Sequence, residues 1–184
     1  MGELEQWENI GLAYPSFTRI LVINKEIVGY YFYVFLKEEY VDELKNGTLS
    51  DEDITLDKIE LPDLPGKYSC YFMDIAIIQD RRWLNVGGSL TSTIQLLLRD
   101  FANQLERLAK NNHVFISDLY THAFTNDGKR WCKRLGMKKT DENPTRTNNI
   151  FYLKLFPFPQ KGFVVDNYPQ LKELYDDYWG KRDV

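Results

Sequence analysis

Apolar and polar residues alternate along the chain in blocks that predict both strands and helices. Apolar residues dominate 19–23 and 27–36, and the short polar segment 24–26 between them predicts two strands joined by a tight turn. Over 37–46 the apolar positions recur at steps of three and four, and Gly47 follows as a helix end would require. The first quarter of the chain therefore predicts a β-hairpin followed by a helix.

The stretch 68–110 has the strongest pattern and organises the rest of the chain. An apolar run at 71–78 predicts a strand, and the polar segment 79–89 after it contains two adjacent glycines. From Leu90 to Leu108, apolar residues then follow at steps of three and four, which is typical of one long amphipathic helix. The order is strand, turn with small residues, helix.

The second half continues the alternation of strands and helices. It predicts a strand at 114–119, a short helix at 128–135 and a last clear strand at 150–156. Two prolines follow, and proline lacks the N–H that a continuing strand needs. The remaining residues show helical spacing. We therefore expect one α/β domain at 1–156 and a C-terminal extension at 157–184 that packs on it.

Composition excludes several classes of protein. The chain has 184 residues and a net charge of −4, which argues against broad nucleic-acid binding. Cys70 and Cys132 lie far apart, which predicts no disulfide framework and favours a reducing cytoplasm. Apolar runs stay shorter than a membrane span, so no membrane partner is expected, and no spacing of ligands predicts a metal site.

The polar segment before the long predicted helix has the chemistry of an anion site. The first N–H groups of a helix have no partner inside it, and the helix dipole makes that end positive. Gly87 and Gly88 would let a phosphate approach those groups closely, and Arg82 would add charge. This favours a phosphorylated cofactor; the alternative is an ordinary connection between a strand and a helix.

The same residues resemble a known family, the GNAT N-acetyltransferases. Arg82 and Gly87 match its acetyl-CoA motif, Gln/Arg-x-x-Gly-x-Gly/Ala, while Asn85 stands where the first glycine is usual. Leu135 and Gly136 resemble its late helix, Leu-Tyr-x-x-x-Gly-Phe. The resemblance covers about residues 19–156. It implies a GNAT-like fold, α/β or α+β, with a mixed central sheet flanked by helices and a C-terminal helical appendage.

The resemblance also implies an activity and an acyl donor. The chain would move an acetyl group from acetyl-CoA to an amine, with the strand backbone pairing with the pantetheine arm and the turn holding the pyrophosphate. The residues expected to bind the donor are Ile75, Ala76, Ile77, Ile78, Arg82, Asn85, Val86, Gly87, Gly88 and Ser89. The acceptor is a small-molecule or protein amine, and a homodimer is left open.

Three residues are candidates for the catalytic chemistry. Cys132 stands where the family places a tyrosine that protonates the departing CoA thiolate. The Cys132 thiol could donate that proton, or neighbouring basic residues could lower its pKa and make it a thiolate. The third alternative is that Cys132 is a small buried hydrophobic residue. Asp74 and Asp118 could take the proton of the amine, or be buried structure. His122 is either an acceptor contact or an ordinary loop histidine.

Two other interpretations compete with the enzyme. Asn85 and Cys132, where the family has other residues, also suit a catalytically inactive GNAT-like binding or interaction module. The basic residues around Trp131 could contact nucleic acid, although a solvated helix face explains them as well. The acidic run at 51–57 could attract a cationic acceptor, and we favour a solvated surface for it.

Overall fold

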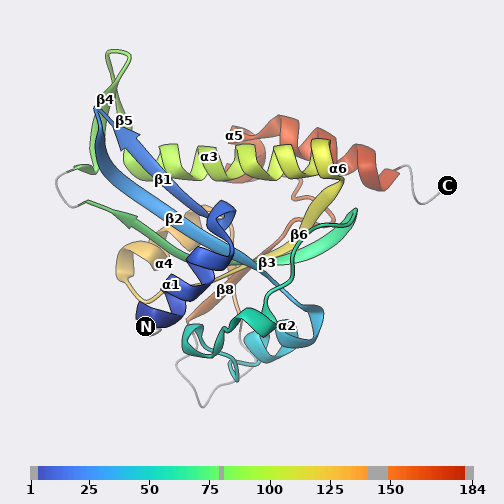
Figure 1. Ribbon diagram of the computed structural model, residues 1–184. Coiled ribbons are helices and arrows are strands. Elements are labelled where there is room, and N and C mark those ends of the chain that lie inside the picture. Colours follow the sequence, from blue (N-terminus) through green and yellow to red (C-terminus); the bar gives the residue numbers. More distant parts are fainter. Residues whose placement is uncertain (1–3, 79–80, 141–148, 181–184) are drawn as a thin grey trace.

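A six-stranded sheet runs through the molecule in the order β1-β2-β3-β6-β8-β7 (Figure 1). This computed structural model describes residues 4–78, 81–140 and 149–180. The strands of the sheet are β1 (Thr18–Ile23), β2 (Glu26–Leu36), β3 (Gly66–Ile77), β6 (Val114–His122), β7 (Lys138–Lys139) and β8 (Ile150–Lys154). The α-helices are α1 (Leu4–Ala13), α2 (Glu38–Lys45), α3 (Thr93–Arg107), α4 (Asn126–Arg134), α5 (Phe163–Asn167) and α6 (Pro169–Gly180).

The sheet is mixed, as the sequence predicts. β2 pairs antiparallel with both β1 and β3, β3 pairs parallel with β6, and β8 pairs antiparallel with both β6 and β7. Helix α3 lies on one face, while α1 and α2 lie on the other (Figure 1). The predicted α/β architecture, a mixed central sheet flanked by helices, is therefore confirmed. Among the described helices, none combines the length and apolarity needed to cross a bilayer.

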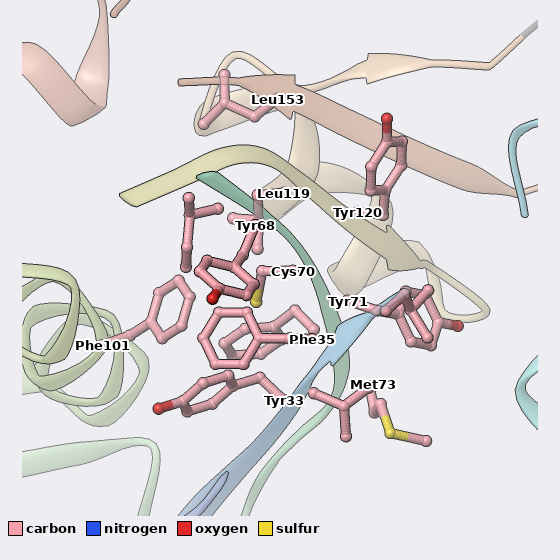
Figure 2. Close-up of a cluster of buried hydrophobic side chains, with 14 of the residues drawn as sticks. Tyr33, Phe35, Tyr68, Cys70, Tyr71, Met73, Phe101, Leu119, Tyr120 and Leu153 are labelled. Carbon is pink, nitrogen blue, oxygen red and sulfur yellow. The ribbon is translucent and has the colours of Figure 1, made fainter. Parts of the chain in front are cut away.

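Aromatic side chains hold α3 against the sheet (Figure 2). Phe101 of α3 meets the ring of Phe72 edge-on at 5.0 Å, and Tyr31 stacks on Phe72 at 5.6 Å. The hydroxyl of Tyr31 donates to Asp100 Oδ2 at 2.7 Å, and Arg19 forms an ion pair with the same carboxylate at 3.0 Å. These contacts fix both the height and the direction of α3 over the strands.

Helix α3 begins later than the sequence predicts. Trp83–Val86 and Ser89–Ser92 form an antiparallel hairpin, β4 and β5, with Gly87 and Gly88 at its tip, so the expected helix start at Ser89 is wrong. The two glycines have φ values of 60° and 84°, which suit a two-residue hairpin turn. The helix starts at Thr93 instead. The glycine pair therefore lies at the end of a projecting hairpin (Figure 1).

The C-terminal residues pack into the core. Tyr175 of α6 is 1% exposed, its hydroxyl accepts a hydrogen bond from the Ile116 N–H at 3.0 Å, and its ring meets Phe115 at 5.2 Å. Leu171, one turn earlier, is also buried. The predicted helical spacing of the tail is confirmed. Its apolar stripe covers β6 rather than facing solvent. Whether 1–156 folds as a unit without this cover stays a prediction.

Candidate active site

The two central strands separate halfway along their length. β3 pairs with β6 from Gly66 opposite Val114 to Phe72 opposite Thr121. Beyond this point β3 continues to Ile77 beside β2, while β6 stays beside β8. Thr121 Oγ1 donates to the Phe72 carbonyl at 2.8 Å at the point of separation. Over its last residues β3 has no strand on its β6 side in the described part of the sheet, so backbone N–H and C=O groups there face a cleft.

A β-bulge marks the same point. Phe32 of β2 faces Asp74 and the next residue, Tyr33, faces Phe72, so Met73 is the extra residue on β3. Bulges bend a strand and re-aim its side chains, and they are frequent next to active sites. The bulge therefore bends β3 at the residue where it leaves β6.

A cavity of about 660 Å³ occupies the cleft and extends under α3 and α4. Its walls come from β3, α3, β6, α4, β8 and the C-terminal helices. Most polar groups lie at the separation of the strands and at its outer end, whereas the inner end is mostly apolar. The polar lining residues are Asp74, Arg82, Ser92, Thr121, His122, Thr125, Asp127, Cys132 and Tyr168.

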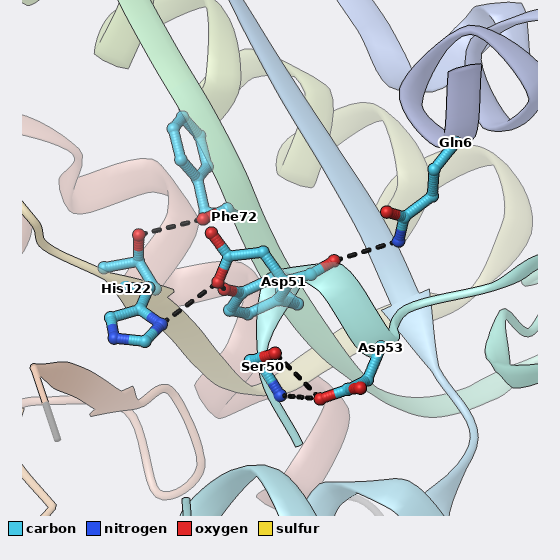
Figure 3. Close-up of polar contacts among 8 residues, drawn as sticks. Gln6, Ser50, Asp51, Asp53, Phe72 and His122 are labelled. Atoms are coloured by element: carbon cyan, nitrogen blue, oxygen red, sulfur yellow. Dashed lines mark hydrogen bonds and ion pairs between the residues drawn. The ribbon is translucent and has the colours of Figure 1, made fainter. Parts of the chain in front are cut away.

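A buried carboxylate holds His122 at the point of separation (Figure 3). His122 Nδ1 lies 3.0 Å from Asp51 Oδ1, and the Tyr71 hydroxyl donates to the same oxygen at 2.9 Å. Asp51 is 3% exposed and the His122 side chain is 14% exposed. His122 lies in the cavity wall, whereas Asp51 lies behind it. The histidine ring also stacks on Phe124 with centroids 4.3 Å apart.

The charge of Asp51 fixes the protonation pattern of the imidazole. Burial alone would raise the pKa of this carboxyl, but the hydrogen bonds with His122 and Tyr71 outweigh burial and lower the pKa below its ordinary value. Asp51 is therefore an anion at neutral pH and accepts hydrogen bonds. A neutral His122 then carries its proton on Nδ1, which leaves the lone pair of Nε2 directed away from Asp51.

The segment that carries Asp51 is held from two sides. Ser50 and Asp53 form a capping box around the short helical turn Asp51–Asp53, with the Ser50 N–H donating to Asp53 Oδ2 at 2.8 Å. Gln6 of α1 donates from Nε2 to the Asp51 carbonyl at 2.9 Å (Figure 3). The expected solvated surface is therefore wrong for Asp51, although Glu52 and Asp53 are exposed.

The outer end of the cavity combines a helix start with a cation. The Thr93 N–H donates to the Arg82 carbonyl at 3.0 Å, so Arg82 lies beside the start of α3 although a hairpin separates the two in sequence. Ser92 caps the helix without a side-chain hydrogen bond, and Arg82 and Ser92 both line the cavity. The first N–H groups of a helix favour anions. The anion-binding elements expected from the sequence are thus adjacent, but without the glycine turn.

The expected donor-binding residues divide into two groups. The first group lies before the hairpin: Ala76 and Ile78 are outside the cavity wall, and Ile75, Ile77 and Arg82 line the cavity. The hairpin residues do not: Val86 and Ser89 pair with each other next to the tip, so the expected cradle of their N–H groups at a helix start is wrong in its geometry. The residues in this second group are Asn85, Val86, Gly87, Gly88 and Ser89.

The three catalytic candidates lie in different places. Asp74 lines the cavity and accepts a hydrogen bond from the Tyr30 hydroxyl at 2.6 Å. Cys132 lines it from α4, and burial raises the pKa of its thiol to about 11, which favours the neutral thiol over the thiolate. Asp118 lies four residues before His122 on β6 and is not part of the cavity wall.

His122 and Asp51 are the residues that sequence reasoning undervalued. The predicted loop at His122 is wrong, because β6 continues through this residue, which pairs with Ile150. The two partners stand 71 residues apart, so no local pattern links them. The spacing of Ser50 and Asp53 was the available signal, because a capping box predicts an ordered turn at Asp51 rather than a solvated acidic run.

Comparisons with known proteins find distant structural similarity and no match in sequence. No family model matches the sequence, and no curated protein matches it. Among solved structures, the chain is similar to Arabidopsis thaliana Naa50 in complex with the bisubstrate analogue CoA-Ac-MVNAL, at 16% identity over 83% of this chain and 82% of that one, with a TM-score of 0.47. It is also similar to Chaetomium thermophilum Naa20 in complex with a bisubstrate analogue, at 11% identity over 88% and 81%, with a TM-score of 0.46.

A third similar structure is AtaTR bound with AcCoA, at 16% identity over 85% of this chain and 82% of that one, with a TM-score of 0.44. Each of the three aligns with more than four fifths of this chain. The mixed sheet flanked by helices that the resemblance implies rests on the order of the strands themselves. Identities and scores this low carry no conclusion about activity, which has to come from the site itself.

Proposed function

We propose that this protein is an acyl-CoA-dependent N-acyltransferase in which His122 is the general base. The observation that carries the proposal is the Asp51–His122 pair at the point where β3 and β6 separate, in the wall of a cavity with an anion-binding outer end. An acyl-CoA donor supplies a thioester carbonyl that an amine can attack. The acceptor we propose is a primary amine, of a small molecule or of a protein.

His122 supplies the step that an ammonium acceptor requires. Nε2 takes one proton from the ammonium, directly or through a water, and the nitrogen then forms a bond to the thioester carbon as the carbon–sulfur bond breaks. The second proton that the nitrogen must lose passes to solvent, and solvent also returns a proton to Cys132 after it has protonated the thiolate. The positive imidazole that results is stabilised by the Asp51 anion on Nδ1. Cys132 remains a neutral thiol, and we propose that it donates its proton to the departing thiolate. His122 and Asp51 are thus assigned roles that Asp74 and Asp118 were expected to hold.

Two features of the chain fit an acyl-CoA donor. The free edge of β3 over Met73 to Ile77 offers backbone groups to an extended amide-containing arm, in the manner of an added strand. Arg82 and the start of α3 offer positive charge to a pyrophosphate at the outer end. The pantetheine arm would thus lead from Arg82 inward to His122.

The test is turnover of the full chain with acetyl-CoA and a panel of amines, together with calorimetry of donor binding. We expect His122→Asn to lower kcat by about 10² to 10⁴, the usual contribution of a general base, with donor affinity unchanged. His113→Asn, at the exposed C-cap of the helical turn Leu108–Asn112 that follows α3, is the matched control and should keep full activity. Unchanged kcat in His122→Asn would remove the assignment of the base.

The inactive-module interpretation makes a different prediction. It requires binding of a partner or a CoA compound without turnover of any amine. The observation against it is the ionised carboxylate held behind His122, because an imidazole with a free Nε2 and a buried anionic partner is an arrangement suited to proton transfer. Donor binding with no release of CoA across the amine panel would favour the module.

A further inference from the structure

The inner part of the cavity extends well past the proposed reaction centre. Thr121 and Phe72 mark the separation of the strands, and the cavity wall continues to Leu155, whose N–H donates to the Ser117 carbonyl at 2.8 Å. Ser117 precedes Thr121 by four strand residues, which is about 13 Å at roughly 3.3 Å per residue. An acetyl group attached at the separation point would not reach the innermost lining residues, Leu155 and Leu171.

The wall of this inner part is apolar. Its side chains come from α3, β6, β8 and the C-terminal helices, and they share aliphatic or aromatic character with little exposure. The buried ones are Phe101, Ala102, Leu105, Leu119, Leu153, Leu155 and Leu171, and Val164 is half-buried; Tyr168, between Val164 and Leu171 in the chain, adds one hydroxyl. Protein interiors rarely keep large voids, and an apolar cavity suits an apolar guest better than water. The inner part therefore has the chemistry of a site for an alkyl chain.

The two faces of the sheet separate donor from acceptor. Phe72 and Leu119 point to the α3 side, where the inner part of the cavity lies. Tyr71 points to the opposite face, where it meets Asp51. Since side chains alternate along a strand, His122 shares its face with Tyr120, over which Lys45 of α2 lies. The base thus faces the α2 side, and an acceptor has to approach from there.

We propose that the apolar inner part of the cavity, bounded by Ala102, Leu155 and Leu171, binds the alkyl chain of a medium-chain acyl-CoA, so that the donor is longer than acetyl-CoA. The inference rests on the proposed acyltransferase function and names its donor. The occupant is an acyl chain rather than part of the acceptor because this space continues the donor cleft on the α3 side.

Calorimetry with the full chain and no acceptor tests the assignment, using CoA, acetyl-CoA and octanoyl-CoA as probes. We expect octanoyl-CoA to bind at least about tenfold more tightly than acetyl-CoA, because each buried methylene adds affinity. Ala102→Leu places extra carbon atoms in the cavity and should abolish that difference while leaving acetyl-CoA affinity unchanged. Ala13→Leu, on the exposed end of α1, should keep the full difference.

Each other outcome is decisive. Equal affinity of the wild type for acetyl-CoA and octanoyl-CoA overturns the alkyl site and leaves the acyltransferase proposal standing, whereas binding of none of the three probes overturns both. Stabilisation of the wild type by octylamine, lost in Ala102→Leu and without any effect of acyl length, assigns the space to the acceptor and overturns the inference. If Ala102→Leu does not melt cooperatively, Val164→Phe, which lines the same cavity from α5, takes its place with the same expected result.

Discussion

At the scale of single residues, the site depends on a partnership that only the fold creates. The sequence already pointed to Asp74, Arg82 and Cys132, and all three line the cavity. The pairing of Asp51 with His122 could not be seen in the sequence, because it joins a turn after α2 to the end of β6. Charge runs are usually solvated, and here one member of such a run is buried among hydrogen-bond donors.

Asp51 should make the stability of the protein depend on pH in the acid range. The folded-state pKa lies below the ordinary value of about 3.9, so the stabilisation is complete above that value and is lost as pH falls through the folded pKa. Urea titrations of wild type and Asp51→Asn between pH 6 and pH 2, about two units either side of that value, should show a steeper acid loss for the wild type.

Glu38→Gln, at an exposed position of α2, is the control for this experiment and should keep the wild-type slope. Identical slopes for wild type and Asp51→Asn would mean that the hydrogen bonds to Asp51 do not hold it in its charged form, and the argument for the free Nε2 of His122 would fail with them.

Cys132 can be tested independently of the base. Its buried thiol stays protonated at neutral pH, and a proton donor to the leaving thiolate is expected to contribute to rate and not to donor affinity. Cys132→Ala should therefore lower single-turnover rates, by about 10² if its help is at the lower end for general acids. The dissociation constant of acetyl-CoA should stay constant. Full turnover in Cys132→Ala would make the cysteine a packing residue.

At the scale of elements, the strands and long helices followed their hydrophobic periods, and the β4–β5 hairpin did not. Four-residue strands are too short for a clear alternation, and Leu90 happens to continue the spacing of the following helix. The informative signal was the pair Gly87-Gly88, because adjacent glycines between two short extended segments are typical of a two-residue hairpin turn. The resemblance to a glycine-rich cofactor motif favoured a different interpretation of the same pair.

Because of the hairpin, we expect substitutions at Gly87 and Arg82 to have opposite effects on stability and on acetyl-CoA affinity. A Cβ at Gly87 meets nothing within 4 Å, but the φ of 60° strains any other residue, so Gly87→Glu should cost about 1–2 kcal/mol of stability and leave acetyl-CoA affinity unchanged. Arg82→Gln, beside the start of α3, should weaken acetyl-CoA binding with little effect on Tm. Calorimetry and thermal melts of both variants measure these two effects. Loss of acetyl-CoA binding in a folded Gly87→Glu variant would show that the hairpin does bind the donor.

At the scale of the whole molecule, the order of elements predicted the mixed sheet, but the tail could not be assigned from its sequence. Helical spacing at Leu171 and Tyr175 predicts an apolar stripe without saying what the stripe covers. In the structure this apolar stripe covers β6. The Tyr175 hydroxyl accepts a hydrogen bond from the Ile116 N–H, next to a shift in the register between β3 and β6. Local sequence patterns do not predict such contacts, since they join residues that are far apart in the chain.

Truncation after Phe156 should therefore disrupt the fold. It removes Leu171 and Tyr175 and exposes Phe115, and losing one large buried side chain alone typically costs about 2–5 kcal/mol. We expect the shortened chain to bind a hydrophobic dye and to lose near-ultraviolet circular dichroism. Glu173→Ala, on the exposed side of α6, is the control. A soluble shortened chain with a cooperative melt would show that 1–156 is a complete domain.

The position of the C-terminal helices has a consequence for how such a protein can change over time. On the proposed assignments, the base and its anion come from β6 and the turn after α2, while Val164 and Leu171 of the last two helices close the far wall of the cavity. Substitutions in the tail can then alter which acyl chains fit without touching proton transfer. Part of donor choice is thus carried by a stretch of the gene separate from the one that carries the chemistry, so selection can act on that part while the chemistry stays fixed.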